Sequence, residues 1–187
     1  MDKIKIIALV GRSSAGKNTV QSILTQLISN SHRIIGCTTR PKREHEEDGK
    51  EYYFLDLPTF TQMLLNGELI EAASYNHNSW FYGTAFECLK PNKINIGIFN
   101  PQAYECMKND SRLNIQLIYL YAPDKIRLQR SLSREDNPDC HEICRRFLSE
   151  DETYTELEEE GDFILFDTSS VEPNYEELIS KLDNFIK

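Results

Sequence analysis

The sequence has no long apolar run, and it contains little glycine and little proline. No run approaches the roughly 20 apolar residues that a transmembrane helix needs, and the N-terminal residues lack the long apolar centre and the cleavage pattern of a signal peptide. Glycine (8) and proline (7) are too few in 187 residues for a collagen-like or low-complexity chain. We therefore expect one cytoplasmic domain, with room for a small inserted lobe and without a membrane partner.

Positive charge is also scarce. The 21 lysines and arginines stand against 30 aspartates and glutamates, which leaves a net charge of −9. A chain this acidic is repelled by a phosphate polymer, so we expect no nucleic-acid partner. The charge balance does not exclude a small anionic ligand in a local basic pocket.

The five cysteines are scattered, and their odd number does not suit a disulfide scaffold. Cys140, His141 and Cys144 lie close together in the sequence, but no second pair of ligands follows at a spacing typical of zinc sites. We interpret them as ordinary helix residues, with part of a metal site as the alternative.

Short apolar runs alternate with amphipathic stretches. Ile4 to Val10 is typical of a strand buried on both faces, and the apolar spacing from Val20 to Ile28 places one stripe on a helix. Further strands are expected at 32–37, 94–99, 115–121 and 163–166, and further helices at 101–108, 124–132, about 141–157 and 175–186. This alternation predicts an α/β fold with a mostly parallel five-stranded sheet flanked by helices.

Two segments depart from the alternation. Residues 38–90 contain charges, aromatic residues and a short helix around 59–65 that Gly67 ends, and we interpret them as an inserted lobe. The acidic run from Glu150 to Glu160 is typical of the solvated face of a helix, and we assign it no chemistry.

Residues 11–19, GRSSAGKNT, fit the pattern G-x-x-x-x-G-K between an expected strand and an expected helix. Gly11 and Gly16 let the backbone wrap closely around phosphate oxygens, while amide N–H groups and the helix N-terminus direct positive charge at the anion. Lys17 adds a full charge for the outer phosphates. The alternative is a structural turn, but the strand–loop–helix setting favours an ATP site formed by Gly11, Ser13, Ser14, Ala15, Gly16, Lys17, Asn18 and Thr19.

The residue after the lysine departs from this motif. The motif has Ser or Thr there, whose hydroxyl coordinates Mg²⁺, whereas this chain has Asn18 followed by Thr19. An amide oxygen ligates Mg²⁺ directly or through water. We therefore expect Mg²⁺ with ATP, and Asn18 is the candidate ligand.

A second cationic cluster lies at Thr38-Thr39-Arg40-Pro41-Lys42-Arg43, directly after an expected strand. Arginine forks bind phosphate oxygens with two hydrogen bonds, and a proline stiffens the loop. Tyr52 and Tyr82 add hydroxyl groups within the same inserted segment. These residues predict a second anion site, with a solvated surface loop as the alternative.

Together these motifs resemble guanylate kinase. The phosphate loop, TTRPKR (38–43), DGKEYYF (48–54), NGELIE (66–71), FYGT (81–84) and a late arginine-rich helix that ends at Arg145-Arg146 follow in the family's order. The resemblance spans nearly the whole chain. It implies a single domain, 1–187, with a P-loop kinase core (1–37, 91–132 and 158–187), a nucleoside-monophosphate-binding lobe (about 38–90) and a helical lid (about 133–157).

The resemblance also implies roles for individual residues. Those expected around the acceptor phosphate of GMP are Arg40, Arg43, Glu46, Tyr52 and Tyr82, while those expected at the guanine base are Glu71 and Thr84. Arg130 would bind ATP, and Lys17, Arg43, Arg134 and Arg146 would be catalytic. Arg127 and Arg145 stay open between a catalytic role and salt bridges with the acidic run.

The chain departs from the family pattern at four places. Gly36 stands where the family has a serine that contacts guanine, and the segment 96–100 replaces a D-x-D motif whose carboxylates help to recognise guanine and to organise the metal. Residues 134–137 replace the R-G-T-D turn of the lid. The segment 76–80 is longer than usual before Y-G-T.

The reaction implied is transfer of the ATP γ-phosphoryl group to GMP or dGMP. One alternative is an interaction module of the same fold without catalysis, although Lys17 and the Arg40/Arg43 pair favour an enzyme. Another is a related P-loop kinase for a different phosphorylated acceptor. Glu71 favours guanine, because a carboxylate pairs with the two adjacent donors of that base. A regulatory GTPase is disfavoured, since the sequence has no N-K-x-D motif.

Overall fold

The structure, a computed structural model, describes residues 3–44, 46–75, 80–134, 136–160 and 162–187. Two features noted in the sequence, the long segment 76–80 and the lid turn 134–137, fall partly outside these ranges. Within them the chain forms a five-stranded sheet and a separate four-stranded sheet.

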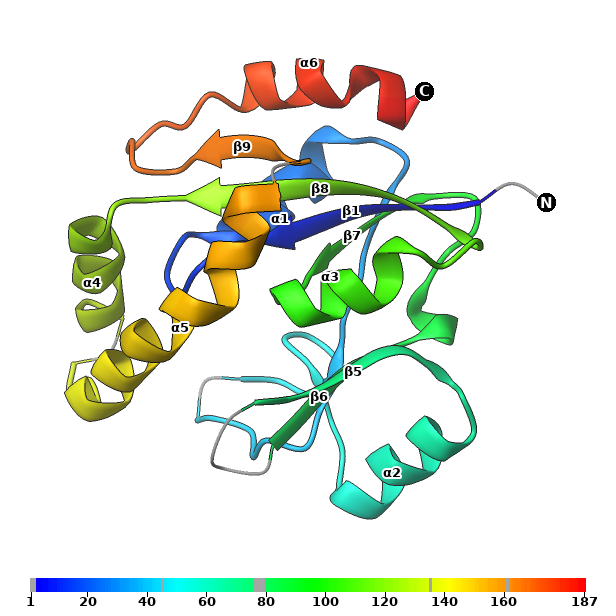
Figure 1. The fold of residues 1–187 in the computed structure, drawn as a ribbon, viewed down its shortest axis with the longest axis horizontal. Coiled ribbons are helices and arrows are strands. Elements are labelled where there is room, and N and C mark those ends of the chain that lie inside the picture. The colour runs from blue at the N-terminus through cyan, green and yellow to red at the C-terminus, as the bar shows by residue number, and fades with distance from the viewer. Residues whose placement is uncertain (1–2, 45, 76–79, 135, 161) are drawn as a thin grey trace.

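The five-stranded sheet has the order β2-β7-β1-β8-β9, and every neighbouring pair is parallel (Figure 1). Its strands are β1 (Ile4–Val10), β2 (Ser31–Arg33), β7 (Ile94–Ile98), β8 (Leu113–Tyr121) and β9 (Ile164–Asp167). The central strand β1 is fully buried from Ile6 to Val10. The predicted α/β fold with a parallel five-stranded sheet is thereby confirmed.

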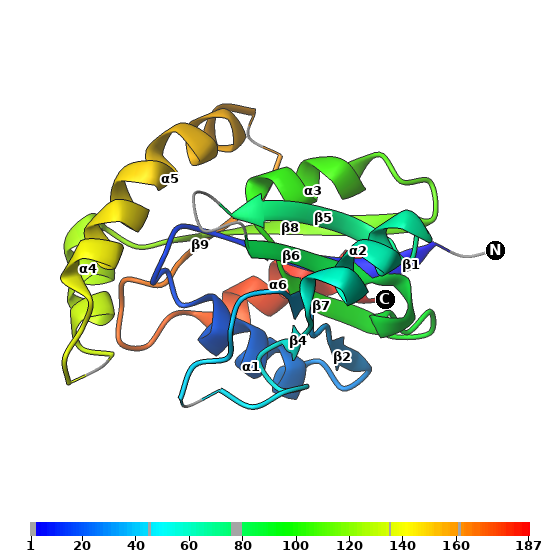
Figure 2. The ribbon, with the colours of Figure 1, turned by 90° about the horizontal axis from the view of Figure 1, so that it is seen from below.

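Helices cover both faces of this sheet, as Figure 2 shows. On one face, α1 (Lys17–Leu27) and α6 (Tyr175–Ile186) share a hydrophobic core with Ile7 and Leu9 of β1. On the other face, α3 (Pro101–Lys108) and α5 (Cys140–Glu160) share a core with Ile6 and Ala8. Alternate residues of β1 therefore serve opposite cores, as its continuous apolar run requires. In the described part of the chain, no helix is long and apolar enough to span a membrane.

The helix bounds follow the sequence closely. α3, α4 (Asp124–Leu132) and α6 begin and end at the predicted residues, while α5 is longer than expected at both ends. Asn100 accepts a hydrogen bond from the Ala103 N–H, and Asn174 accepts one from the Glu177 N–H, so side-chain caps fix the starts of α3 and α6.

The four-stranded sheet lies within the segment expected as an inserted lobe, with the order β4-β3-β6-β5. Its elements are β3 (Cys37–Thr38), β4 (Tyr53–Phe54), α2 (Leu57–Leu65), β5 (Leu69–Tyr75) and β6 (Trp80–Ala85), followed by a 3₁₀ turn at Phe86–Cys88. Asp56 caps α2, and Gly67 follows its end with φ of 67°, as the predicted termination requires.

The prediction of a single strand at 32–37 is wrong. In the five-stranded sheet, β2 pairs with β7, and the Ile34 N–H then donates to the Ile96 carbonyl oxygen. Beyond this point the chain leaves that sheet, and β3 pairs with β6 of the four-stranded sheet. Gly36 lies at this crossing, where a Cβ would approach the Gly83 carbonyl oxygen to 3.0 Å. One apolar run therefore supplies strands to two sheets, because the backbone changes its partner halfway.

Asn95 is a fully buried polar residue at the start of β7. Its Nδ2 donates to the carbonyl oxygens of Lys5, Lys90 and Lys93 at 3.0–3.1 Å, and its Oδ1 accepts from the Lys90 N–H at 2.8 Å. The side chain thus fixes the turn 90–93 against β1. A buried polar group is tolerated here because its partners satisfy it.

We predict that Asn95→Ala lowers the free energy of unfolding by about 2–4 kcal/mol, because it removes the four hydrogen bonds of a fully buried side chain and leaves a cavity there. Urea unfolding measures the change. Asn114, exposed on β8 of the same sheet, is the matched control, and Asn114→Ala should change stability by less than about 0.5 kcal/mol. Equal stability of the two variants would contradict this account of Asn95.

Candidate active site

The loop between β1 and α1 is shaped by two glycines. At Gly11 a Cβ would lie 2.6 Å from the Leu120 carbonyl oxygen of β8, so a side chain there collides with the sheet. Gly16 precedes α1 with φ of 88°, a left-handed conformation that favours glycine. Ser14 also has a positive φ, 60°, which is strained for a residue with a side chain. The loop is therefore held in a tight arch at the carboxyl edge of the parallel sheet.

The Lys17 side chain folds back over this loop. Its Nζ donates to the carbonyl oxygens of Gly11 at 2.5 Å and Arg12 at 3.0 Å. Burial lowers the pKa of Lys17 to about 8, while the charge of Glu150 acts in the opposite direction. The ammonium group thus lies at the loop, where a bound anion would favour its charged form.

A cavity of about 880 Å³ brings the phosphate loop and the four-stranded sheet together. It is lined by nearly all the residues expected at the ATP and GMP sites, namely Ser13, Ser14, Gly16, Lys17, Asn18, Thr19, Arg40, Arg43, Glu46, Tyr52, Glu71, Tyr82, Thr84, Arg130, Arg134 and Arg146. Gly11 and Ala15 do not line it. Both are buried beneath the loop, and Ala15 belongs to the core between the sheet and α1.

One carboxylate organises the cationic cluster of the lobe. Glu46 accepts from the Arg40 guanidinium at 2.7 Å and from the Arg43 backbone N–H at 2.8 Å. Burial acts to raise the pKa of Glu46, but these hydrogen bonds and the two cations hold it below its usual value. Partial burial and the charges of Arg40 and Arg146 lower the pKa of Arg43. Cations from the lobe and from α5 therefore face the same cavity.

Glu71 lies deep in the lobe side of this cavity, 8% exposed, on β5 opposite Thr84 of β6. Burial raises the pKa of Glu71 to about 7, and a hydrogen bond with Thr84 acts against this shift. Cys37 lies nearby and donates to the Gly83 carbonyl oxygen at 3.3 Å, and burial raises the pKa of its thiol to about 12. The pocket around Glu71 is thus enclosed and only weakly polar.

The late arginines have different surroundings. Arg130 on α4 donates to the Thr168 carbonyl oxygen at 2.5 Å and to the Ser14 carbonyl oxygen at 3.5 Å, so it lies against the loop. On α5, Arg145 and Arg146 both donate to Glu142, at 2.7 and 2.8 Å. Hydrogen bonds from Arg145 and Arg146, together with the charges of these two arginines, lower the pKa of Glu142 to about 2. Arg134 is exposed and lines the cavity.

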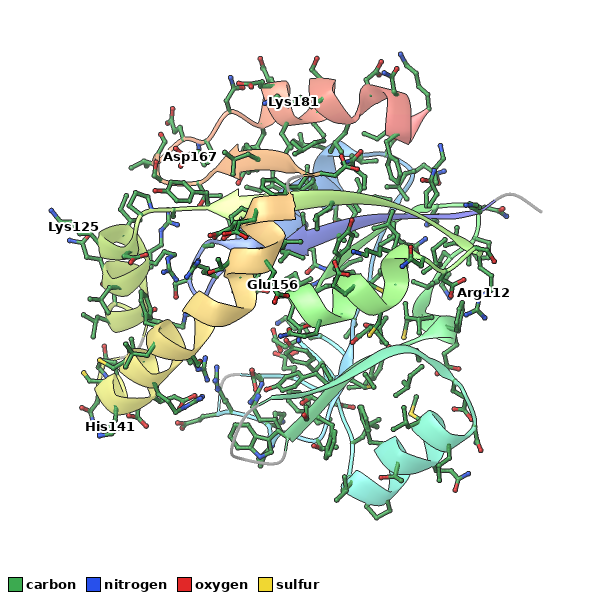
Figure 3. The ribbon with its side chains drawn as sticks, viewed as in Figure 1. Arg112, Lys125, His141, Glu156, Asp167 and Lys181 are labelled. Atoms are coloured by element: carbon green, nitrogen blue, oxygen red, sulfur yellow. The ribbon has the colours of Figure 1, made fainter. Side chains whose placement is uncertain are left out.

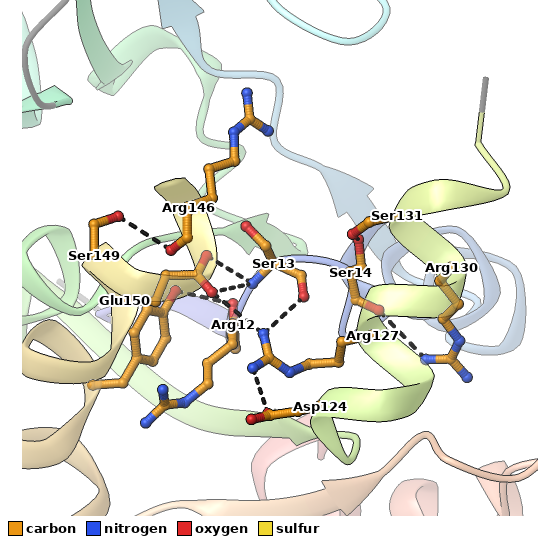
Figure 4. Close-up of polar contacts among 12 residues, drawn as sticks. Arg12, Ser13, Ser14, Asp124, Arg127, Arg130, Ser131, Arg146, Ser149 and Glu150 are labelled. Atoms are coloured by element: carbon orange, nitrogen blue, oxygen red, sulfur yellow. Dashed lines mark hydrogen bonds and ion pairs between the residues drawn. The ribbon is translucent and has the colours of Figure 1, made fainter. Parts of the chain in front are cut away.

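Two residues at this site were missed by the sequence analysis. Glu150, interpreted as part of a solvated face, is 4% exposed and accepts from the Ser13 backbone N–H at 2.8 Å (Figure 4). Thr168, after β9, donates through Oγ1 to the Ala15 carbonyl oxygen at 2.9 Å and so supports the loop from beneath. Neither has a local signal, because both act through contacts with residues more than 130 positions away.

Asn18 is exposed and lines the cavity beside Lys17. In the described part of the chain, no three histidine, cysteine, aspartate or glutamate side chains gather as a metal site would require. Cys140, His141 and Cys144 lie on α5, and all three are exposed. An amide oxygen next to a triphosphate site fits Mg²⁺, which is commonly held by few protein ligands together with substrate phosphates and water.

Comparisons with known proteins agree with this geometry. A family model described as guanylate kinase matches residues 3–187. The guanylate kinase of Malacoplasma penetrans is 30% identical over 169 residues, 87% of this chain and 85% of that protein. Those of Chlorobium chlorochromatii and Thermotoga maritima are 39% and 37% identical over 83 and 82 residues, 44% of this chain in each case. These two alignments span 43% and 39% of the relatives' own length.

A crystal structure of guanylate kinase from Anaplasma phagocytophilum shares the fold. Its TM-score is 0.64 at 19% identity, and the match covers 100% of this chain and 86% of that chain. The match to the family model extends over almost every residue, from the phosphate loop through the lobe to α6. The chain belongs to the guanylate kinase family.

Proposed function

We propose that this chain transfers the γ-phosphoryl group of ATP to GMP or dGMP and releases ADP and GDP or dGDP. The observation that carries the proposal is that one cavity is lined both by the phosphate loop and by the Arg40–Glu46 cluster. Two anion sites in one enclosure are what a transfer between two nucleotides needs. A site for ATP alone would not require the second cluster.

Phosphoryl transfer depends on alignment of donor and acceptor and on positive charge around the moving group. On the donor side, Lys17, the loop N–H groups and Arg130 bind ATP. On the acceptor side, Arg40, Arg43, Tyr52 and Tyr82 orient the phosphate of GMP, while Glu46 holds the two arginines in place. Arg134 and Arg146 lie between these sites and stabilise the charge that develops during transfer.

When bound together with ATP, Mg²⁺ would neutralise charge on the phosphates. We propose Asn18 as the protein ligand, through its side-chain oxygen. This chain's own contribution is then to orient the phosphates by the loop backbone and Lys17. The substrates are thus small nucleotides, which an acidic chain admits to a local cationic cavity.

The choice of guanine rests on Glu71. An ionised carboxylate accepts two hydrogen bonds from the adjacent N–H groups of guanine, and the edge of adenine offers no such pair of donors. Thr84, opposite Glu71 in the sheet register, lies where it can contact the base as well. A related kinase with another acceptor would gain nothing from this buried acid.

We predict that Lys17→Ala lowers kcat by about 10²-fold or more, because the reaction loses a charge already placed at the donor phosphates. A coupled assay of ADP release with GMP measures the change. Lys125, which is exposed on α4 and points away from the fold, is the matched control for net charge (Figure 3). Near-normal turnover of Lys17→Ala would refute the role of this lysine.

The same assay tests the acceptor when it is repeated with GMP, dGMP, AMP, CMP, UMP and dTMP. We expect turnover with the guanine nucleotides and little with the others. Thermal shifts with Mg·ATP and with GMP complete the test, because ligand binding stabilises the folded chain. An interaction module without nucleotide sites would show neither turnover nor stabilisation, and the proposed function would fail.

We further predict that KM for GMP falls as pH rises from 6 to 8. Glu71 has a pKa raised to about 7 in the free enzyme, and guanine needs its ionised form. One pH unit below that pKa only about a tenth of the carboxyl is ionised, so KM should be about tenfold higher there than on the alkaline plateau.

The acceptor phosphate itself titrates near pH 6, so the profile needs a matched variant. Glu71→Gln removes the carboxyl titration and leaves that of GMP. It should show a higher KM for GMP with a flatter pH profile. A profile with the same slope in both proteins would mean that Glu71 does not recognise the base.

A further inference from the structure

The acidic run on α5 begins with a glutamate that is not solvated. Glu150 is 4% exposed, and both of its carboxylate oxygens accept from the Ser13 backbone N–H, at 2.8 and 3.0 Å (Figure 4). A carboxylate is thus bound to the backbone of the phosphate loop by a helix far away in the sequence. The expectation that this run forms a solvated face without chemistry is wrong at its first residue.

An arginine of α4 completes the arrangement. Arg127 is 2% exposed, and its Nη1 lies 3.3 Å from the Glu150 carboxylate and donates to the Ser13 carbonyl oxygen at 3.1 Å. Its Nη2 donates to Asp124 at 2.7 Å, and its guanidinium lies 4.4 Å from the centre of the Phe147 ring. The N–H and the C=O of Ser13 are therefore bound to the two partners of one buried ion pair (Figure 4).

A buried ion pair of this kind is a poor source of stability, because desolvation of both charges offsets much of their attraction. Its established use is to specify one arrangement among alternatives. Here the arrangement specified is the orientation of the two peptide groups that flank Ser13, next to the strained Ser14. Ser14 is itself bound to α4, because its Oγ lies 2.6 Å from the Ser131 Oγ.

We propose that the Arg127–Glu150 pair positions the phosphate loop for ATP. The pair binds the backbone N–H and C=O of Ser13, which belong to two consecutive peptide groups, so it fixes the direction in which the following N–H groups point. It also joins the loop to α4 and α5, which bear Arg130 and Arg146, and Arg134 follows the end of α4. The contacts of Arg127 and Glu150 with Ser13 therefore also set the distance between the phosphate loop and the arginines on these helices. Neither partner is assigned a contact with substrate, and the inference rests on the proposed function.

The chain contains a matched control for this pair. Arg12 of the same loop and Glu158 of the same helix form an ion pair at 3.2 Å, with side chains 17% and 38% exposed. This outer pair joins two side chains and does not bind the Ser13 backbone. Exposed pairs contribute little because water screens them. If any ion pair between the loop and α5 were enough to position the loop, substitution of Glu150 or of Glu158 would change ATP affinity equally.

The experiment compares wild type, Glu150→Gln, Arg127→Met, the double variant and Glu158→Gln. Calorimetry gives Kd for Mg·ATP and, separately, for GMP, and thermal unfolding verifies that each protein is folded. We expect Glu150→Gln and Arg127→Met to weaken ATP binding about tenfold or more, a loss of about 1.4 kcal/mol or more. GMP binding should change less than about twofold, as should both affinities of Glu158→Gln.

The double variant keeps the comparison valid if a single variant fails to fold, because it leaves no isolated buried charge. We expect it to be more stable than either single variant and yet weaker than wild type for ATP by about tenfold. If the double variant regains stability but not ATP affinity, the pair positions the loop and does not act only by stabilising the fold.

Three results would overturn the inference. Unchanged ATP affinity in the folded variants would show that the loop holds its shape without the pair. Tighter ATP binding in Glu150→Gln would show that the carboxylate competes with the phosphates. An equal loss for ATP and GMP would show a general loss of structure. If wild type binds ATP but phosphorylates no GMP, the proposed function fails while the ATP comparison still decides this inference.

Discussion

The arrangement of this protein depends on holding cations close together around a cavity. Arginines that face one another repel, and several arginines near the cavity are paired with a carboxylate. Glu46 binds Arg40 in the lobe, Glu142 binds Arg145 and Arg146 on α5, and Glu150 binds Arg127 beneath the phosphate loop. These carboxylates orient the cations while leaving positive charge toward the cavity. A net charge of −9 is therefore compatible with a cationic cavity, because some of the carboxylates hold the arginines of the cavity in place.

The parallel sheet determines where these groups meet. Strands β1, β8 and β9 end at the same edge, and there β1 leads into the phosphate loop, β8 into α4 and β9 into Thr168. Thr168 contacts both the loop, through the Ala15 carbonyl oxygen, and Arg130. The side of the cavity at the phosphate loop is thus assembled from the ends of neighbouring strands. The opposite side comes from the four-stranded sheet, whose strands lie between β2 and β7 in the sequence.

Much of this could be predicted from local patterns. The helices α3, α4 and α6 have a single apolar stripe and clear starts, and the phosphate loop is a local motif, so periodicity and spacing were sufficient. The segment 32–37 was predicted wrongly because an apolar run does not indicate when the backbone changes sheets. Glu150 was missed for a related reason. Among neighbouring acids it has no distinguishing local feature, and only its contact with Ser13 and Arg127 sets it apart.

The departures of this sequence from the family pattern bear directly on recognition of the acceptor base. In the segment that replaces the family's D-x-D motif, Ile98 and Phe99 line the cavity, and Phe99 is buried in the core. Asn100 uses its side chain to cap α3. None of these three side chains is ionised, so this segment supplies no charge to the cavity. Burial raises the pKa of Glu71, because it penalises the charged form of the carboxyl group. Under the proposed function, a guanine that donates to this carboxylate would favour its ionised form, so the acid that is costly to ionise in the free protein would be the group that distinguishes guanine from adenine.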